Sequence, residues 1–255
     1  MKHSKYPLLE FDPTIPAIIE PSHVVQDISA PEVCVFCFFG DVIEDLRKEG
    51  RLRKISSHKW EDLDRPLYEM EVEGRRVGVF QPGVGAPLTA ALMEEVIASG
   101  CRKIVACGGA GVLDGKIAVG AILIPTTAVR DEGTSFHYLP PGREIEADQE
   151  VVDVMEHVLR EKGIEYTKVK TWTTDAPYRE TPEKIKLRKA EGCLTVEMET
   201  AAFFAVAHFR GVPFGQILYG GDDVSGNSWD RRDWHNRLEV RQNLFWLAVD
   251  ICLNL

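Results

Sequence analysis

Short runs rich in β-branched and aromatic residues alternate along this chain with longer stretches in which apolar residues recur at helical spacing. Such alternation favours βα units around a largely parallel sheet, because each strand needs a helix to carry the chain back. The sequence therefore predicts an α/β fold. The runs that predict strands are 33–39, 76–80, 103–107, 121–129, 166–172 and 214–219.

The helical stretches between these runs each close on a glycine, the residue that best fits the left-handed cap after a helix. They cover 41–50, 87–100, 148–163, 181–192 and 199–211. The last stretch, 230–255, carries leucine, alanine and isoleucine at near-helical spacing. It predicts one long amphipathic helix that closes the domain.

Residues 1–32 contain five prolines and no clear periodicity. They predict an irregular N-terminal arm that packs on the domain or on a neighbouring molecule. The remaining residues, 33–255, contain no repeat and no linker, and the whole chain of 255 residues is 44% hydrophobic. That length and composition suit one large α/β domain with a well-buried core.

Charge and hydropathy exclude two classes of partner. The chain has 30 basic and 40 acidic residues, a net charge of −10, and no long run of lysine or arginine, so we expect no nucleic-acid surface. No apolar run approaches the roughly 20 residues of a membrane span, so no membrane partner is expected. The start MKHSKYPLLEFDP lacks the apolar core of a signal peptide, and we expect a cytoplasmic protein.

The six cysteines are too sparse for a disulfide scaffold in a chain of this length. Cys34, Cys37, Cys101 and Cys107 lie in apolar runs, and we interpret them as core thiols. The pair Cys34 and Cys37 has metal-site spacing, but no second cysteine or histidine pair answers it. We therefore expect no metal.

Glycine-rich strand ends are the first sign of a binding site. Gly83 and Gly85 are expected to form a tight turn that leads into a helix. Two interpretations are open: the backbone N–H groups of this turn bind an anion, or the turn is purely structural. Leu88 occupies the third glycine position of a dinucleotide fingerprint, which disfavours an NAD-dependent enzyme. Gly108 and Gly109 end the next strand and also allow close backbone approach.

Carboxylates follow two further predicted strands. Glu197 and Glu199 flank a methionine at the mouth of an apolar helix, and buried carboxylates need a partner that neighbouring residues do not supply; a ligand is one candidate. Asp222 and Asp223 follow the last strand, where a helix cap or solvated turn is the alternative to a site. In open α/β sheets ligands bind outside the carboxyl ends of strands, so these loops are expected to converge on one crevice.

Five segments make a resemblance specific. GVGAPLTAALMEE, ACGGAGVLDGKIAVGAILIPTTAVRDEGTSFHY, TWTTDAPY, TVEMETAA and GGDDVSG occur in the order and spacing of the purine and uridine phosphorylase family. The chain resembles that family over nearly all of residues 75–250. The resemblance implies a single α/β domain with a mixed, strongly curved sheet flanked by helices, and assembly into a homodimer or hexamer.

The resemblance also implies cleavage of the N-glycosidic bond of a nucleoside, with inorganic phosphate as co-substrate and no other cofactor. Glu199 would accept hydrogen bonds from the ribose hydroxyls while Met198 packs against the sugar. Asp223 would be the general acid for the leaving base, with a pKa raised toward the operating pH. The remaining candidates are Trp172 or Tyr178, with Glu197, for the base, Thr89 for the sugar, and Gly83, Gly85 and Thr89 for the phosphate.

Departures from the family pattern bear on the nucleophile. The Gly-Asp-Pro-x-Arg phosphate loop has its best counterpart in residues 19–23, which lack the glycine and the arginine, and a second phosphate arginine falls near Val105. Residues 179–183 replace the Gln and Arg with which uridine phosphorylases bind uracil. A nucleoside phosphorylase is the leading hypothesis; the alternatives are a hydrolytic nucleosidase, which needs no anion cradle, and a nucleoside-binding module without catalysis. The arginines considered as substitutes are Arg65, Arg75, Arg76 and Arg130.

Overall fold

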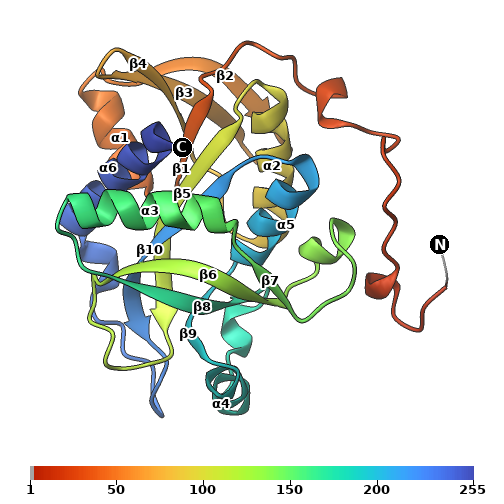
Figure 1. Ribbon diagram of the computed structural model, residues 1–255, viewed down its shortest axis with the longest axis vertical. Coiled ribbons are helices and arrows are strands. Elements are labelled where there is room, and N and C mark those ends of the chain that lie inside the picture. Colours follow the sequence, from red (N-terminus) through yellow and green to blue (C-terminus); the bar gives the residue numbers. More distant parts are fainter. Residues whose placement is uncertain (1–2) are drawn as a thin grey trace.

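A ten-stranded mixed β-sheet runs through the computed structural model, which describes residues 3–255 (Figure 1). All six runs predicted as strands are strands, and the first of them, β1, is buried along its whole length, as its continuous apolar sequence requires. The strands are β1 Val33–Cys37, β2 Arg53–Lys59, β3 Asp64–Val72, β4 Arg75–Phe80, β5 Lys103–Val112, β6 Ile122–Asp131, β7 Glu144–Glu146, β8 Tyr166–Thr174, β9 Cys193–Glu197 and β10 Phe214–Asp223.

Strand β5 joins the two parts of the sheet because it pairs with three other strands. It pairs in parallel with β1 over its first half and with β10 along nearly its whole length, and its end pairs antiparallel with β9. Since β10 continues through β6 and β8 to β9, these strands close into a ring, from which β1, β4, β3 and β2 extend as an open sheet. The mixed, curved sheet implied by the family resemblance is confirmed. The largely parallel sheet favoured by the alternating pattern is wrong, because β6 pairs antiparallel with β7 and β10, β3 with β2 and β4, and β5 with β9.

Helices cover both faces of the open part of the sheet, with α1, α3 and α6 on one side and α2 and α5 on the other (Figure 1). The glycine that follows each of the first five α-helices has a positive φ, as predicted, for example +64° at Gly211. The helices are α1 Gly40–Lys48, α2 Ala86–Ala98, α3 Gln149–Glu161, α4 Pro182–Ala190, α5 Thr200–Arg210 and α6 Leu238–Asn254.

The last helix is shorter than the sequence predicts. It begins at Leu238 instead of near residue 230, because Arg232 and Asp233 have positive φ values of 49° and 51°. A short 3-10 helix, Trp234–Asn236, precedes it. The helical periodicity of residues 230–255 comes from the second half of that stretch.

The antiparallel hairpin of β2 and β3 was not predicted from the sequence. It lies in a polar segment with no strand signal.

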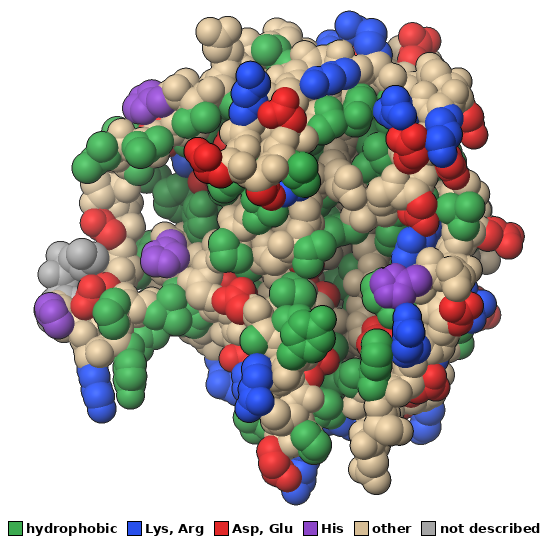
Figure 2. Space-filling view, turned by 180° about the vertical axis from the view of Figure 1, so that it is seen from behind, with side chains coloured by type: hydrophobic (Ala, Val, Ile, Leu, Met, Phe, Trp, Pro, Cys, Tyr) green, Lys and Arg blue, Asp and Glu red, His purple; other side chains and the backbone are tan. Residues whose placement is uncertain are grey.

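Residues 3–32 lie outside the sheet and form two 3-10 helices, Pro7–Leu9 and Pro21–His23. Glu20 ties this arm to α5 through an ion pair of 3.1 Å between its Oε2 and Nη1 of Arg210. Figure 2 shows that the arm arches beside the body of the molecule and that acidic and basic side chains are interspersed over that face. All six cysteines are free and buried, which confirms the core thiols. No helix within residues 3–255 is long and apolar enough to cross a membrane.

Candidate active site

Loops from five strands meet at a cavity of about 490 Å³. It lies where β1, β4 and β9 end and where β5 and β10 pass beside them, the position at which α/β sheets bind ligands. The two glycine-rich segments meet here as the sequence predicts, but Gly108 and Gly109 lie within β5, which continues to Val112, and not at its end. The lining residues are Phe38, Phe39, Gly40, Asp41, Val84, Gly108, Gly109, Glu197, Met198, Glu199, Gln216, Leu218, Trp234, His235 and Arg241.

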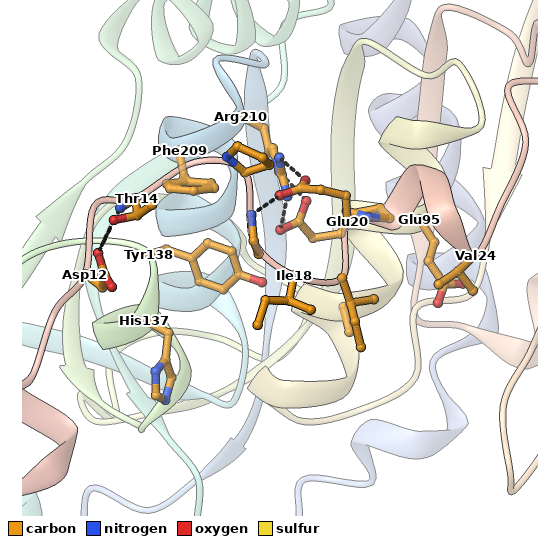
Figure 3. Close-up of a pocket in the computed structure, with 16 residues that line it drawn as sticks. Asp12, Thr14, Ile18, Glu20, Val24, Glu95, His137, Tyr138, Phe209 and Arg210 are labelled. Atoms are coloured by element: carbon orange, nitrogen blue, oxygen red, sulfur yellow. Dashed lines mark hydrogen bonds and ion pairs between the residues drawn. The ribbon is translucent and has the colours of Figure 1, made fainter.

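A larger cavity, of about 630 Å³, lies between the N-terminal arm and helices α2 and α5 (Figure 3). Its charged groups satisfy one another, since Arg210 bonds to both Glu94 and Glu20. His137 and Tyr138 also line it, and burial raises the pKa of Tyr138 above its usual value. Because this cavity lies away from the strand ends and its Arg210, Glu94 and Glu20 bond to one another, we place the candidate active site in the smaller one.

Glu197 is an anchor for the backbone at the start of α5. Its Oε1 accepts from the hydroxyls of Thr173 at 2.6 Å and Thr171 at 3.3 Å. Its Oε2 accepts from the backbone N–H groups of Glu199 at 2.7 Å and Thr200 at 2.6 Å, which are free donors of a helix N-terminus. The chain itself therefore supplies the partners of this carboxylate. Glu197 lines the cavity but has no oxygen left unengaged for a base, contrary to the expectation from the sequence.

Glu199 has a different environment two residues later. Its side chain is 6% exposed, and its Oε1 accepts from the backbone N–H of Gly85 at 2.6 Å. This bond is the role of the glycine-rich loop: Gly85 has a φ of +97°, which directs its N–H toward the carboxylate. Burial, and then the charge of Glu197, raise the pKa of Glu199 to about 8. The cavity thus holds a buried carboxyl group, that of Glu199, whose pKa is raised and which has one hydrogen-bond donor from the chain.

Asp223 does not line the cavity. Its Oδ1 accepts from the backbone N–H of Ser225 at 2.7 Å, and its Oδ2 pairs with Arg232. Burial acts to raise the pKa of Asp223, but the hydrogen bonds from Ser225 and the charge of Arg232 outweigh it and hold the pKa below its usual value. The raised pKa expected for a general acid is therefore wrong for this structure, because Arg232 pairs with the carboxylate and no motif indicated that pairing.

Two other acids lie near this strand end. Asp222 accepts a hydrogen bond from Trp229 Nε1 at 2.6 Å. Its carboxylate packs beside Gly111, with Oδ1 3.5 Å from the position that a Cβ at residue 111 would occupy. Burial, and then the charge of Asp222, raise the pKa of Glu180 to about 7. Glu180 belongs to the stretch 179–183 that departs from the family pattern. It is the acid of this group whose pKa lies closest to neutral pH.

The comparisons with known proteins agree with this arrangement. The family model described as "Phosphorylase superfamily" matches residues 32–245. The chain belongs to the phosphorylase superfamily. It is 28% identical over 156 residues to the guanosine phosphorylase of Halorubrum lacusprofundi, which covers 61% of this chain and 65% of that protein.

This superfamily member has other relatives of similar distance. It is 28% identical over 187 residues to the uridine phosphorylase of Treponema pallidum, covering 68% of this chain and 71% of that protein. The crystal structure of uridine phosphorylase from Vibrio fischeri superposes with a TM-score of 0.74 over 93% of this chain and 97% of that chain, at 20% identity. The match spans just under two thirds of the guanosine phosphorylase.

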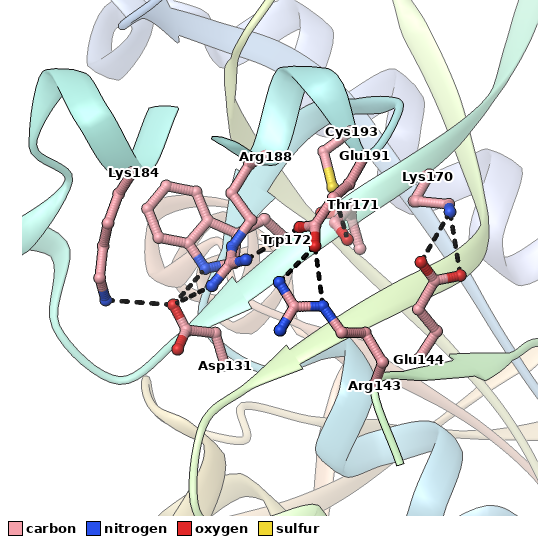
Figure 4. A network of polar contacts seen from close by, with 10 residues as sticks. All are labelled: Asp131, Arg143, Glu144, Lys170, Thr171, Trp172, Lys184, Arg188, Glu191 and Cys193. Carbon is pink, nitrogen blue, oxygen red and sulfur yellow. Dashed lines mark hydrogen bonds and ion pairs between the residues drawn. The ribbon is translucent and has the colours of Figure 1, made fainter. Parts of the chain in front are cut away.

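Both aromatic residues that the sequence offered for stacking on a base lie outside the cavity. Trp172 is fully buried between β8 and α4, and its Nε1 donates to Asp131 Oδ2 at 2.9 Å (Figure 4). The guanidinium of Arg188 lies 5.3 Å from its ring centroid, so the ring has no open face toward a ligand. Tyr178 is 99% exposed. The expectation for these residues came from their place after a strand, which does not fix the direction of a side chain.

Thr89 is also fully buried. Its hydroxyl lies 3.1 Å from the carbonyl oxygen of Gly85 and 3.2 Å from that of Ala86, the local bonds of a first helical turn. Thr89 therefore stabilises the start of α2, and Gly83 and Gly85 shape the loop before that helix. Of the residues proposed for the sugar, Glu199 and Met198 line the cavity.

The loop that follows the first strand is not the one expected from the sequence. Residues 19–23 lie in the arm, whereas the first strand is β1, and Gly40 and Asp41 follow it. The glycine and aspartate of the family phosphate loop thus have counterparts, but the arginine does not. The signal in the sequence was the Gly-Asp pair after an apolar run, whereas the counterpart expected at residues 19–23 shares only its proline with the family loop.

Sequence reasoning also missed the contribution of the C-terminal segment. Trp234 and His235 stack at 3.8 Å between ring centroids, and both line the cavity. Arg241, in the first turns of α6, lines it as well. These residues lie beyond the segments that carry the family resemblance, so no motif pointed to them.

Proposed function

We propose that the protein cleaves the N-glycosidic bond of a nucleoside with inorganic phosphate, releasing the free base and ribose 1-phosphate. The observation that carries the proposal is Glu199, a buried carboxyl group that one backbone N–H holds at the wall of a cavity in a phosphorylase-superfamily fold. A carboxylate in this position accepts hydrogen bonds from two sugar hydroxyls. Met198 beside it offers an apolar surface to the sugar ring.

The chemistry follows from what a glycosidic bond needs. A phosphate oxygen forms a bond to the anomeric carbon while the bond from that carbon to the base nitrogen breaks, and its electron pair leaves with the base. The sugar passes through a cation-like transition state, which negative charge on Glu199 stabilises and a fixed sugar pose favours. The base leaves more easily when it gains a proton.

Asp223 and Glu180 are our candidates for supplying that proton. Asp223 holds the position that the family motif gives to the acid, but it is paired with Arg232 and must take up a proton against that charge. Glu180 carries a pKa of about 7 and is partly protonated at neutral pH. Turnover by Asp223→Asn and Glu180→Gln at saturating nucleoside separates them, since the variant of the true acid loses about 10²- to 10⁴-fold in kcat.

Hydrolysis is the second candidate function, and one observation favours it. Among the described residues that line the cavity, Arg241 is the one arginine or lysine, and its Nη1 is paired with Asp41 Oδ2 at 2.7 Å. Water needs no cationic cradle, so a cavity with few cations suits it. Sequence relatives that are named phosphorylases favour phosphate.

The deciding experiment follows base release from a panel of purine and pyrimidine nucleosides, with enzyme dialysed free of phosphate and then with phosphate restored. Chromatography identifies the sugar product. Phosphorolysis predicts release that requires phosphate and yields ribose 1-phosphate. Release in phosphate-free buffer that yields free ribose contradicts phosphorolysis and supports the nucleosidase. Nucleoside binding without release under either condition contradicts both and supports a binding module.

We further propose that the protein is a homo-oligomer and that the N-terminal arm contributes to the contact. Ile15, Ile18, Ile19 and Val24 on the arm are 61%, 98%, 73% and 61% exposed, an unusual density of open aliphatic side chains. Light scattering coupled to size exclusion measures the assembly. A monomeric mass at micromolar concentration, or the same oligomer after Ile18→Ser with Ile19→Ser, contradicts the assignment.

A further inference from the structure

The arginines that sequence reasoning offered in place of the missing phosphate residues are all engaged away from the cavity. Arg75 donates to the carbonyl oxygen of Leu253, and Arg76 to Glu69. Arg130 is buried and donates to the hydroxyl of Ser135 and the carbonyl oxygen of Pro140. Arg65 pairs with Asp62 and lies beside Gly83, outside the lining of the cavity. An anion in this site needs another cation.

Arg241 is a cation that the fold delivers to the cavity and holds in place. Its side chain is 12% exposed, and its guanidinium carbon lies 5.4 Å from the ring centroid of Phe39 and 5.9 Å from that of Trp234. Aromatic faces stabilise a guanidinium without consuming its N–H donors. Burial opposes its charge, but hydrogen bonds with Tyr219 and Asp41 outweigh that effect and raise the pKa of Arg241.

The donors of Arg241 are only partly used. Nη1 bonds to Asp41, whose other oxygen caps the backbone N–H of Val42 at 3.0 Å. The Nε of Arg241 is buried and has no acceptor among residues 3–255. A guanidinium carries five N–H groups in a planar fork that matches two oxygens of a phosphate, so Asp41 and Tyr219 together leave donors free. Asp41 thus orients the fork while part of it faces the cavity.

We propose that Arg241 is the phosphate-binding residue of this cavity, supplied by the C-terminal helix in place of arginines from the sheet. This inference rests on the proposed function for the location of the substrate. The phosphate group has two possible sources: the inorganic phosphate that attacks the sugar, or a 5′-phosphate ester carried by a nucleotide substrate. Both present two oxygens to the same fork, and they differ in whether the sugar is attached.

Binding of each probe by calorimetry tests the assignment without reference to turnover. Inorganic phosphate, a nucleoside and its 5′-monophosphate are titrated into the wild type and into Arg241→Gln. Loss of a charged hydrogen-bonding pair corresponds to a roughly 10- to 100-fold weaker affinity for the phosphate-bearing probe. Arg51→Gln is the matched control. The guanidinium of Arg51 also packs on a tryptophan, 4.4 Å from the ring of Trp246 in α6, but Arg51 lies outside the cavity.

The outcomes separate the two sources. Weaker binding of inorganic phosphate by Arg241→Gln, with nucleoside binding within twofold of wild type, supports the inference and phosphorolysis together. A wild type that does not bind inorganic phosphate, but loses 5′-monophosphate affinity on substitution, supports Arg241 and contradicts phosphorolysis. Affinities of all three probes within twofold of wild type overturn the inference.

Two further variants keep the test decisive if Arg241→Gln is unstable. Arg241→Lys retains the charge without the fork, and we expect it to bind phosphate with an intermediate affinity. Asp41→Asn retains the guanidinium and removes the competing negative charge, so phosphate binding should tighten severalfold. If Asp41→Asn instead weakens phosphate binding as much as Arg241→Gln does, Arg241 serves the packing of α6 and the inference is wrong.

Discussion

The ends of β9 and β10 each carry two acids close together, yet their surroundings give them opposite properties. At the end of β9, Glu197 takes four hydrogen bonds from the chain and Glu199 takes one backbone N–H at 2.6 Å. At the end of β10, Asp222 is bonded to Trp229 and Asp223 to Ser225 and Arg232. The pKa of Glu199 is raised to about 8, and that of Asp223 is lowered.

The difference shows that the donors around a carboxylate, rather than its place after a strand, decide what it can do. In the first region Glu197 satisfies the start of α5, which leaves its neighbour without a cationic partner and open to a ligand. In the second region the pair with Arg232 helps to close the loop between β10 and α6, and Asp223 also bridges to Asp230 through backbone hydrogen bonds of 2.8 and 3.0 Å. The acids of one region line the cavity, and those of the other hold a loop.

The largest effect should follow from removing the anchor of the first region. Glu197→Ala leaves two backbone N–H groups and two threonine hydroxyls without their acceptor in a buried place. We expect the free energy of unfolding to fall by about 3–5 kcal/mol, because each buried donor left unpaired costs about 1–3 kcal/mol and the hydroxyls can partly re-pair. Urea denaturation measures it. A loss below about 1 kcal/mol contradicts the structural role of Glu197.

Glu199→Gln should spare stability and damage binding. The amide cannot carry the charge that the sugar hydroxyls are expected to meet, and a hydrogen bond to a charged group contributes about 1.5–3 kcal/mol. We expect nucleoside affinity at pH 9 to weaken by about 10- to 100-fold, measured by calorimetry. Glu156→Gln is a control, since Glu156 is another mostly buried acid that binds Tyr166 on the far side of the sheet. Unchanged nucleoside affinity in Glu199→Gln contradicts the assignment of Glu199 to the sugar hydroxyls.

Much of this fold could be predicted because its signals are local. Apolar runs and helix-ending glycines correctly placed the main strands and helices, for example β5 and the helix that Gly211 ends. The hairpin of β2 and β3 was missed because its strands are mostly polar and partly exposed, so alternation is weak. The late start of α6, which follows the positive φ of Arg232 and Asp233, was missed because Arg232 donates to the carbonyl oxygens of Ile117 and Gly115, which are distant in sequence.

The candidate site was predictable only where a motif fixes the backbone. The Val-Glu-Met-Glu motif placed Met198 and Glu199 at the cavity because a strand end and a helix start hold both. Trp172 was misjudged because a residue on a strand faces one side or the other, and Asp131 and Arg188 draw this ring into the interior. Arg241 could not be found because its role depends on how α6 lies against β1 and β5 in three dimensions.

The pH dependence of binding should separate the two regions next. Because burial and Glu197 raise the pKa of Glu199 to about 8, nucleoside binding that requires its ionised form should strengthen about tenfold between pH 7 and pH 9 and then level off. Glu199→Gln should give a flat profile over the same range. Calorimetry in matched buffers measures both, and parallel profiles for the two proteins contradict the assignment.

Stability should change with pH in the opposite direction. The folded protein binds a proton at Glu199 that the unfolded chain releases above pH 4.5, so the stabilisation is present below that pH and is lost as the pH rises through about 8. The free energy of unfolding of the wild type should therefore decline relative to Glu199→Gln from pH 5 to pH 8. Denaturant titrations at several pH values measure the difference, and a constant difference rules out a raised pKa at this residue.

The smallest effect concerns the second region. Arg232→Gln removes the ion pair of Asp223, both of whose side chains are mostly buried, with 15% and 14% exposure. We expect a loss of about 1 kcal/mol at pH 7. Since the pair lowers the pKa of Asp223, its stabilisation is present above pH 3.8 and disappears as the pH falls through the lower folded-state value.

Arg231→Gln is the matched control for this pair, because its guanidinium lies 5.6 Å from the Trp229 ring and makes no bond to Asp223. Thermal denaturation at pH 7 and near pH 2.5 should show a loss for Arg232→Gln that shrinks in acid and a small, pH-independent change for Arg231→Gln. If the two variants behave alike, Arg232 does not lower the pKa of Asp223. Asp223 would then be free to titrate like Glu199, and the contrast between the two strand ends would lie in the number of donors alone.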